Sequence, residues 1–318
     1  MNVMDLTISI VSYNTRDILK NCLSSIYKDP IDLSFEVIVV DNASSDGSAD
    51  MVAADFPQVH LIRNPTNRLF SKANNQSLRL AGGEFFALIN PDTVVSANAL
   101  KRMVEFMRQH PETGMVGPKI YNDHGQWQPS YARTNTWLWG LAEFLLINAV
   151  FCQNRLFWHK YYEGRNLEMP GPHEVDYVTA ACLLLRRSLL DKFGGMDENY
   201  EMYYEEPDLG ELIRKEGFKV MYWPAVSVVH LVGQSTRKMP VLQVHRWAWN
   251  SQLYFYKKHY SIYTYVLFRS LSIFTWPLFV LTWHIRRLLG LKNRFNYSRV
   301  TSRLSNPRVT PPNLNTPY

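Results

Sequence analysis

The chain has 318 residues, of which 46% are hydrophobic and 19% are charged, and its net charge is +6. This composition supports a large buried core and excludes a disordered chain. The charge is unevenly spread, because the first 216 residues carry −8, whereas the 102 residues after Glu216 carry fourteen Lys or Arg and no acidic residue. Such asymmetry is typical of a protein that meets a membrane or a nucleic acid at one end.

Apolar strands and amphipathic helices alternate through the first hundred residues. The pattern predicts strands at 6–13, 35–41, 59–63 and 85–89, with helices at 17–28, 48–56 and 71–80 between them. Later apolar runs predict a strand at 175–186 and another that ends at His230. Alternating units of this kind predict an α/β fold, with a Rossmann-like, mostly parallel sheet flanked by helices.

The cysteines and the first residues of the chain indicate the cellular compartment in which the protein is expected to work. Cys22, Cys152 and Cys182 are widely spaced, so they predict neither a zinc pair nor a disulfide framework. We interpret Cys22 and Cys182 as small core residues. Residues 1–5 lack the basic segment and apolar core of a signal peptide. We therefore expect a protein of the reducing cytoplasm.

A single carboxylate stands where the strand at 85–89 ends. Pro91 cannot donate to a sheet ladder and biases Asn90 towards an extended conformation, so the strand should stop there. Asp92 then lies at the carboxyl edge of the sheet, where open α/β folds bind ligands, and its oxygens suit a divalent cation. The alternative is that Asp92 only caps the helix that begins near Ala97.

Polar residues also follow the other predicted strands. Asp41, after the second strand, can accept the N–H of a pyrimidine base; the alternative is an ordinary polar turn. The segment 67–75 supplies amides near a helix start, suited to ribose or phosphate oxygens. The candidate ligand-binding residues at this edge are Ser12, Tyr13, Asn14, Asp41, Asn42, Ser44, Asn67, Asn74 and Asn90.

These segments together resemble the inverting family 2 glycosyltransferases, and more narrowly the bacterial rhamnosyltransferases of O-antigen and related cell-surface glycans. The resemblance covers roughly residues 5 to 235. It rests on four motifs: IVSYN at 10–14, VVDNASSDG at 39–47, NPDT at 90–93 and YYEEPDL at 203–209. It implies a GT-A fold, a nucleotide-diphosphate sugar donor and a Mg²⁺ or Mn²⁺ ion. Asp41 would contact the base, and Asp92 would match the metal-binding end of the family's DXD element.

The reaction that the resemblance implies requires a general base, because an acceptor hydroxyl must lose its proton as it attacks the anomeric carbon. The family usually has Glu-Asp in the fourth motif with the second acid as base, so the matching residue is Glu206. Glu205 is the second candidate and Asp208 an orienting or capping group. The alternative is an acidic first helical turn, favoured by the helix dipole.

Three positions extend or depart from the family pattern. Asn90 replaces the first carboxylate of DXD, so the ion would share its ligands with water and the diphosphate. Leu69 stands where relatives usually have Gly. His230 ends an apolar strand, where similar enzymes often place a histidine near the metal or the diphosphate; otherwise a strand-end histidine is usually structural.

The C-terminal region combines cations, aromatic residues and an apolar run at 270–283 that contains Pro277. Fourteen residues fall short of the roughly twenty that span a bilayer. A helix lying in the interface, with basic residues near anionic headgroups, is favoured over a nucleic-acid groove. We therefore expect peripheral association with the cytoplasmic face of the inner membrane, and no nucleic acid partner.

These observations predict a GT-A domain at 1–236, with an aromatic-rich insertion at 134–165 that is either a core helix pair or a lipid or partner surface. A basic helical membrane-association region with a loose tail follows at 237–318. The leading hypothesis is transfer of L-rhamnose from dTDP-rhamnose to a lipid-linked saccharide acceptor. The alternatives are a UDP-hexose-dependent transferase and a non-catalytic nucleotide-sugar-binding assembly protein. A sugar nucleotidyltransferase is disfavoured, because no Gly-rich loop follows the first strand.

Overall fold

The computed structural model describes residues 4–30, 32–128, 130–132, 140–141, 144–145, 171–231 and 239–290. Most of the expected insertion at 134–165, the expected boundary at 236/237 and the tail after residue 290 lie outside the described residues.

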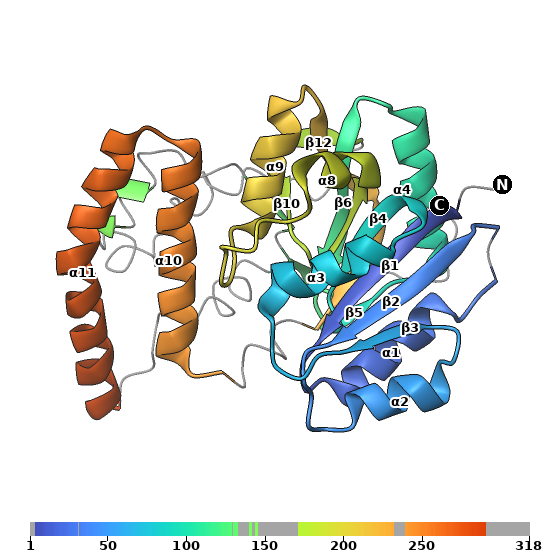
Figure 1. The fold of residues 1–318 in the computed structure, drawn as a ribbon, viewed down its shortest axis with the longest axis horizontal. Helices are drawn as coiled ribbons and strands as arrows, with labels where there is room; N and C mark the ends of the chain where they lie inside the picture. Colours follow the sequence, from blue (N-terminus) through green and yellow to red (C-terminus); the bar gives the residue numbers. More distant parts are fainter. Residues whose placement is uncertain are drawn as a thin grey trace.

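The first half of the sheet has the predicted alternation of strands and helices. Four parallel strands stand in the order β3-β2-β1-β4. A mixed sheet of this kind confirms the α/β class (Figure 1). The elements are β1 (Met4–Ser12), α1 (Arg16–Ile26), β2 (Phe35–Asp41), α2 (Ser48–Asp55), β3 (His60–Arg63), α3 (Leu69–Leu80) and β4 (Gly83–Ile89).

The second half continues the sheet as β4-β11-β6-β12-β5, with β11 antiparallel to both neighbours and β6 parallel to β12. Its elements are β5 (Thr93–Val94), α4 (Ala97–Gln109), β6 (Thr113–Tyr121), β7 (Trp127–Gln128), β8 (Tyr131–Ala132), β9 (His173–Val175), β10 (Tyr177–Val178), β11 (Cys182–Arg186), α8 (Arg187–Phe193), α9 (Glu205–Lys215) and β12 (Lys219–His230).

The prediction of one strand at 175–186 is wrong, because three short strands replace it. β9 pairs with β12, β10 with β8, and β11 with β4 and β6. The backbone between β10 and β11 leaves the ladder: Thr179 N–H donates to Ser130 O (2.9 Å), and Ala180 N–H donates to a side chain of α9. An amide that donates elsewhere cannot join a sheet ladder, so the strand is interrupted there.

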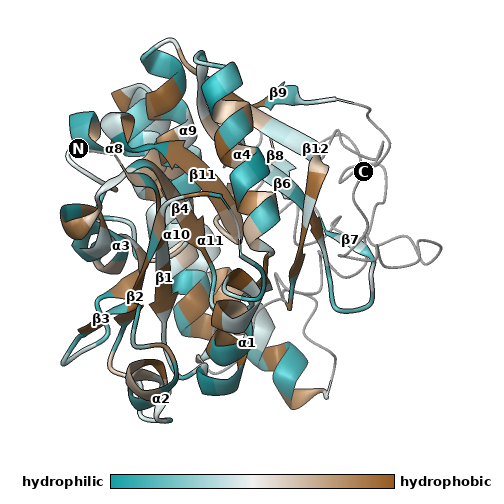
Figure 2. Ribbon diagram, turned by 90° about the vertical axis from the view of Figure 1, so that its right-hand side faces the viewer, coloured by the Kyte–Doolittle hydropathy of each residue, from teal (hydrophilic) through white to brown (hydrophobic). Residues whose placement is uncertain are grey.

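Alternate residues of the central strands face two separate cores, as the pleat of a strand requires. Phe85, Ala87 and Ile89 of β4 join the cluster covered by α1, α2 and α4, whereas Phe86 and Leu88 join the cluster covered by α8 and α9. Figure 2 shows β1, β2 and β4 hydrophobic along their length, between helices with hydrophilic outer faces. The buried free thiols Cys22 and Cys182 are core residues, as expected.

Two helices, α10 (Val241–His259) and α11 (Ile262–Leu288), follow the sheet and lie side by side at one end of the molecule (Figure 1). They pack through Leu253 and Tyr256 of α10 and Phe268 of α11. α11 is 27 residues long and contains Pro277. The helix is therefore longer than the fourteen-residue apolar run, because flanking residues on both sides continue it.

Candidate active site

The carboxyl ends of β1, β2 and β4 meet at one edge of the sheet. The register pairs Ser12 with Asp41 across β1 and β2, and Ser9 with Leu88 across β1 and β4. Asp41 and Asn90 therefore lie at the same edge, as the sequence predicts for parallel strands.

Asp41 is a buried carboxylate with one oxygen unused. Its side chain is 4% exposed, and Oδ2 accepts the N–H of Ser44 at 3.0 Å. Oδ1 is buried and, among the described residues, has no hydrogen-bond partner. An unsatisfied buried acceptor is costly, so this atom is suited to a donor group on a ligand.

The loops around Asp41 are held by one another. Asn14 N–H donates to Ser44 Oγ (2.9 Å), and Asn14 Oδ1 accepts from Ser45 N–H (2.7 Å). Ser12 Oγ lies 2.9 Å from Thr15 Oγ1. Ser12, Asn14 and Ser44 thus shape the edge through contacts within the protein. Tyr13 stands between them and is half-buried.

The asparagine side chains predicted to bind the ligand also make hydrogen bonds within the protein. Asn42 donates to Leu69 O (3.2 Å) and accepts from Asn64 (2.9 Å), and Asn67 Oδ1 accepts from Leu69 N–H (2.9 Å). Asn74 is 1% exposed, accepts from Ser9 Oγ (2.7 Å) and donates to the backbone of α3. In this structure Asn74 supports the packing of α3 on β1.

Asp92 does not cap the next helix. Ser96 is the N-cap of α4, and its side chain accepts from Ala99 N–H at 3.2 Å. Asp92 is instead 5% exposed, and its Oδ1 lies 3.1 Å from Nε2 of His230, at the end of β12. The other ring nitrogen of His230 lies 3.2 Å from Gln128 Oε1. No sequence signal pointed to Gln128, because only the pairing of β7 with β6 brings it there.

The backbone between β10 and β11 brings Glu206 to the turn that holds Asn90 and Asp92. Ala180 N–H donates to Glu206 Oε1 at 3.0 Å. The next residue, Ala181, accepts through its carbonyl from Asn90 N–H (3.2 Å) and Thr93 Oγ1 (2.8 Å). Ala180 and Ala181 therefore connect Glu206, the candidate base, to the turn that holds Asp92, the candidate metal ligand.

Both glutamates at the start of α9 have raised pKa values. Burial raises the pKa of Glu206, although the Ala180 N–H opposes the shift. Burial, followed by the charge of Glu206, raises the pKa of Glu205 well above its ordinary value. A carboxylate with a raised pKa is a stronger base, so the arrangement suits proton abstraction. Asp208 belongs to the same turn, but its side chain contacts Lys258 and His259 of α10.

Strained backbone gathers in the loops of this region. Among the described residues, five non-glycine residues have positive φ: Asn14, Ala43, Leu69, Tyr203 and Tyr204. Asn14 and Ala43 follow β1 and β2, Leu69 is the first residue of α3, and the two tyrosines precede α9. Leu69, at φ 63°, adopts a conformation that favours glycine. Such strain persists where the surrounding structure imposes it, often at functional sites.

Within the described ranges, no group of three or more His, Cys, Asp or Glu side chains is arranged to hold a metal ion. Any ion at Asp92 and His230 would therefore need ligands from elsewhere. An open cavity of about 590 Å³ lies away from these residues, lined by Glu201, Leu242, Gln243, Arg246, Trp247, Trp276 and Val280.

Comparison with known proteins gives the family. The profile of glycosyl transferase family 2 matches residues 7–194, a region that contains Asp41 and Asp92 and ends before Glu205. The chain is 27% identical over 215 residues to the N-acetylglucosaminyl-diphospho-decaprenol L-rhamnosyltransferase of Mycobacterium tuberculosis, covering 64% of this chain and 69% of that protein. It is 25% identical over 246 residues to the O-antigen biosynthesis protein RfbC of Myxococcus xanthus, covering 75% of this chain and 18% of that protein.

A solved structure supports the fold. The crystal structure of GalNAc-T7 with UDP, GalNAc and Mn²⁺ matches with a TM-score of 0.56 at 15% identity, over 79% of this chain and 48% of that one. The chain thus spans about half the length of that protein. The profile match extends over more than half of this chain, and the chain therefore belongs to glycosyl transferase family 2 and is a glycosyltransferase.

Proposed function

We propose that this glycosyltransferase moves L-rhamnose from dTDP-rhamnose onto a lipid-linked saccharide at the cytoplasmic face of the inner membrane, by single displacement with inversion. The observation that carries the proposal is the connection of Glu206 to the Asn90–Asp92 turn through Ala180 and Ala181. A base beside a nucleotide-diphosphate site is the arrangement that direct attack by a hydroxyl needs.

Asp41 binds the base of the donor in this proposal. Its unused Oδ1 is buried at the edge of the sheet and would accept the imide N–H of thymine or uracil. The two bases present the same N–H, so this contact does not distinguish a dTDP donor from a UDP donor. The choice of L-rhamnose rests on the rhamnosyltransferase relative, and the choice of dTDP as its nucleotide rests on the resemblance of the four motifs to bacterial rhamnosyltransferases.

Asp92 and His230 would hold a divalent cation, Mg²⁺ or Mn²⁺. Gln128 Oε1 faces Nδ1 of His230, which favours a proton on that nitrogen. Nε2 then presents a lone pair towards Asp92 Oδ1 at 3.1 Å, and two facing acceptors are stable only with a proton or cation between them. These two ligands fit an ion whose remaining positions are filled by diphosphate oxygens and water. When bound, the ion stabilises the charge of the departing diphosphate.

Glu206 takes the proton of the acceptor hydroxyl as it attacks. Its raised pKa makes the carboxylate a better proton acceptor than an ordinary glutamate. Glu205, beside it, is buried and is the second candidate. Asp208 is not a base in this proposal, because its oxygens accept from Tyr200 and from Lys258 and His259 of α10.

α11 is the proposed membrane contact. Among the described residues it is the helix long and apolar enough to cross a bilayer, and no acidic residue follows Glu216. We favour an interfacial position, with the outer apolar face towards the acyl chains and the basic residues near anionic headgroups. Exposed apolar residues three, four or seven positions apart gather on that face, as helical periodicity requires: Tyr263, Val266, Leu267, Phe274, Leu278, Leu281 and Ile285.

The open cavity between α10 and α11 is the proposed place for the lipid-proximal part of the acceptor. Arg246 offers a cation for a diphosphate, and Trp247 and Trp276 offer flat faces for a sugar. Glu201, which also lines the cavity, stands four residues before Glu205 in the chain. An acceptor held there would approach the start of α9 from the membrane side.

A thermal-shift and transfer panel tests the function. Wild-type enzyme is melted with dTDP-rhamnose, UDP-hexoses and GDP-mannose, each with Mn²⁺ or with EDTA, and then assayed with a short-chain prenyl-diphosphate N-acetylglucosamine. We expect dTDP-rhamnose with Mn²⁺ to raise the melting temperature and to support transfer, since a ligand that binds only the native state stabilises it. A UDP-hexose that does both would favour the alternative donor. Binding without transfer from any donor would favour a non-catalytic assembly protein.

A further inference from the structure

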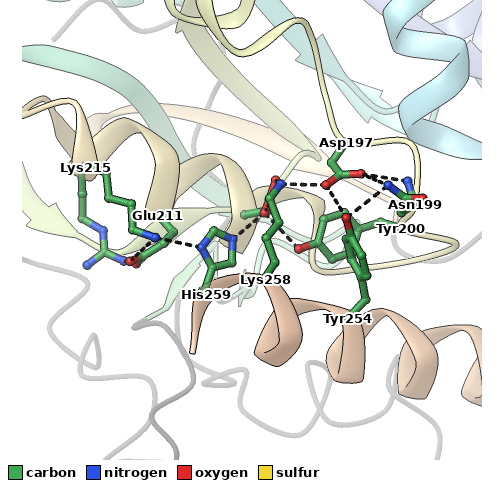
Figure 3. Close-up of polar contacts among 10 residues, drawn as sticks. Asp197, Asn199, Tyr200, Glu211, Lys215, Tyr254, Lys258 and His259 are labelled. Atoms are coloured by element: carbon green, nitrogen blue, oxygen red, sulfur yellow. Dashed lines mark hydrogen bonds and ion pairs between the residues drawn. The ribbon is translucent and has the colours of Figure 1, made fainter. Parts of the chain in front are cut away.

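A polar cluster centred on a buried carboxylate joins α10 to the first turn of α9 (Figure 3). We call it the α9–α10 cluster. Its α10 members come from the last two turns of that helix, beyond the region that matches the family profile. The cluster consists of Asp197, Tyr200, Asp208, Tyr254, Lys258 and His259.

Asp208 is the centre of the cluster and is 1% exposed. Its carboxylate accepts from Tyr200 OH at 3.0 Å, Lys258 Nζ at 2.9 Å and His259 Nε2 at 2.6 Å. A buried carboxylate is tolerated only when it is paired and hydrogen-bonded. Because α10 supplies two of these three donors, Asp208 depends on α10 to remain buried in this position.

His259 is fixed through both ring nitrogens. Its side chain is 2% exposed, and its Nδ1 lies 3.2 Å from Lys215 Nζ at the end of α9. An ammonium group only donates, so Nδ1 is the acceptor and Nε2 carries the proton given to Asp208. His259 therefore connects the first and last turns of α9, and Figure 3 shows it between Lys215 and Lys258.

A second carboxylate holds Lys258 on its other side. Asp197 accepts from Lys258 Nζ (2.7 Å) and from Tyr254 OH (3.0 Å). Burial acts to raise the pKa of Asp197, but hydrogen bonds from Lys258 and Asn199 prevail and lower it to about 2. Lys258 thus bridges two carboxylates, one before α9 and one within its first turn.

α10 also holds the loop that leads into α9. Ser251 Oγ accepts from the N–H groups of Glu201 (3.2 Å) and Met202 (3.3 Å), and the Phe255 ring lies 5.5 Å from that of Tyr204. The loop ends in two positive-φ residues, the second of which is Tyr204. Strained backbone persists only where its surroundings impose it, and here α10 provides those surroundings.

We propose that His259, together with Lys258, is a positioning residue for sugar transfer: by holding Asp208 it fixes the first turn of α9 and so the placement of Glu206. The inference rests on the proposed function, in which Glu206 is the base. Asp208 follows Glu206 by two residues, and its N–H donates to Tyr204 O at 3.0 Å, so the three positions belong to the same turn.

Three substitutions on α10 test this role. His259→Leu removes both ring nitrogens, His259→Gln keeps a donor near the position of Nε2, and Lys258→Met removes a cation whose side chain is already 25% exposed. Lys257→Met is the matched control, because Lys257 is exposed and lies over the Tyr265 ring of α11. Each variant is assayed with a water-soluble acceptor, and hydrogen exchange is followed across residues 201–209.

We expect His259→Leu and Lys258→Met to lower kcat by about 10- to 100-fold, since a small displacement of a reacting group has effects of that size. The KM for the donor should change by no more than about twofold, because Asp41 and Asp92 are outside the cluster. Exchange across 201–209 should increase in both variants. His259→Gln should recover most of the rate, and Lys257→Met should match the wild type.

Unchanged exchange and kcat in Lys258→Met and His259→Leu, beside an active wild type, would overturn the positioning role and leave the proposed function intact. A fall in kcat without faster exchange, or a rise in donor KM equal to the loss of rate, would also overturn it. If His259→Leu does not fold, Lys258→Met and His259→Gln decide the matter. A wild type that transfers no sugar would overturn the proposed function itself, and the positioning role with it.

Discussion

The donor edge of the sheet and the pair α10–α11 use their polar groups in opposite ways. The loops after β1 and β2 bond to each other and to α3, and leave one buried oxygen, Asp41 Oδ1, without a partner among the described residues. α10 instead directs its polar groups at α9, while α11 presents apolar side chains outwards. The edge of the sheet that is proposed to bind the sugar donor is thus held by its own loops. The start of α9 depends instead on α10, which comes later in the chain.

Substitution of Asp41 tests the sugar-donor site in this comparison, and its expected effect is larger than those of the changes to α11, Glu205 and Leu69 that follow. Asp41→Asn removes the charge that faces the donor base, and a hydrogen bond to a charged group contributes about 1.5–3 kcal/mol. We expect kcat/KM for the donor to fall about 10- to 100-fold with kcat nearly unchanged, as measured by steady-state kinetics. Asp50→Asn, on the exposed face of α2, is the control. An unaltered donor KM in Asp41→Asn would show that the base binds elsewhere.

Substitutions on the outer face of α11 should have the next largest effect, a loss of binding to lipid vesicles. Phe274, Leu278 and Leu281 are 76%, 51% and 56% exposed, and each would contribute about 1.5–3 kcal/mol if buried in lipid. The triple change to Ser should lower binding to phosphatidylglycerol vesicles more than tenfold in sedimentation assays, with transfer to a soluble acceptor unaffected. Leu80→Ser, on α3, is the control. If the triple variant bound vesicles as well as the wild type does, the outer face of α11 would not be a membrane contact.

The sequence predicts features that depend on neighbouring residues, but not contacts between residues that lie far apart in the chain. The strand-end positions of Asp41 and Asp92 follow from local patterns, because parallel strands bring their carboxyl ends to one edge. The contact of His259 with Asp208 joins residues 51 apart, and no periodicity reports such a pair. Long-range pairing also explains the failed strand at 175–186: Ala180 N–H donates to Glu206, a choice that apolar pattern cannot indicate.

Glu205 offers a test of stability against pH. Burial raises its pKa, so the folded state binds the proton more tightly than the unfolded chain, and stability falls as pH rises above the ordinary glutamate value. Glu205→Gln removes this penalty. We expect a gain on the order of 1 kcal/mol in the free energy of unfolding at pH 8 that disappears near pH 4, measured by urea denaturation.

Exposed Glu105 of α4 serves as the control for that measurement, since Glu105→Gln should show no such pH-dependent gain. A Glu205→Gln variant less stable than the wild type at pH 8 would mean that the charged carboxylate is satisfied in the folded state.

The smallest predicted effect concerns Leu69, whose φ is 63°. At positive φ glycine is favoured over alanine, so Leu69→Gly should be more stable than Leu69→Ala by about 1 kcal/mol. At exposed Lys72, within the same helix, the order should reverse by a similar amount. Thermal melts of the four variants check this. The same order at both positions would refute strain at Leu69.

The central claim is that Glu206 acts as the base beside a nucleotide-sugar site, and Glu206→Gln tests it most directly. The variant keeps the shape of the side chain but cannot accept the proton. We predict that transfer falls by about 10²- to 10⁴-fold, while the donor still raises the melting temperature as it does in the wild type. Transfer at the wild-type rate, or a loss of donor binding as large as the loss of transfer, would contradict the account.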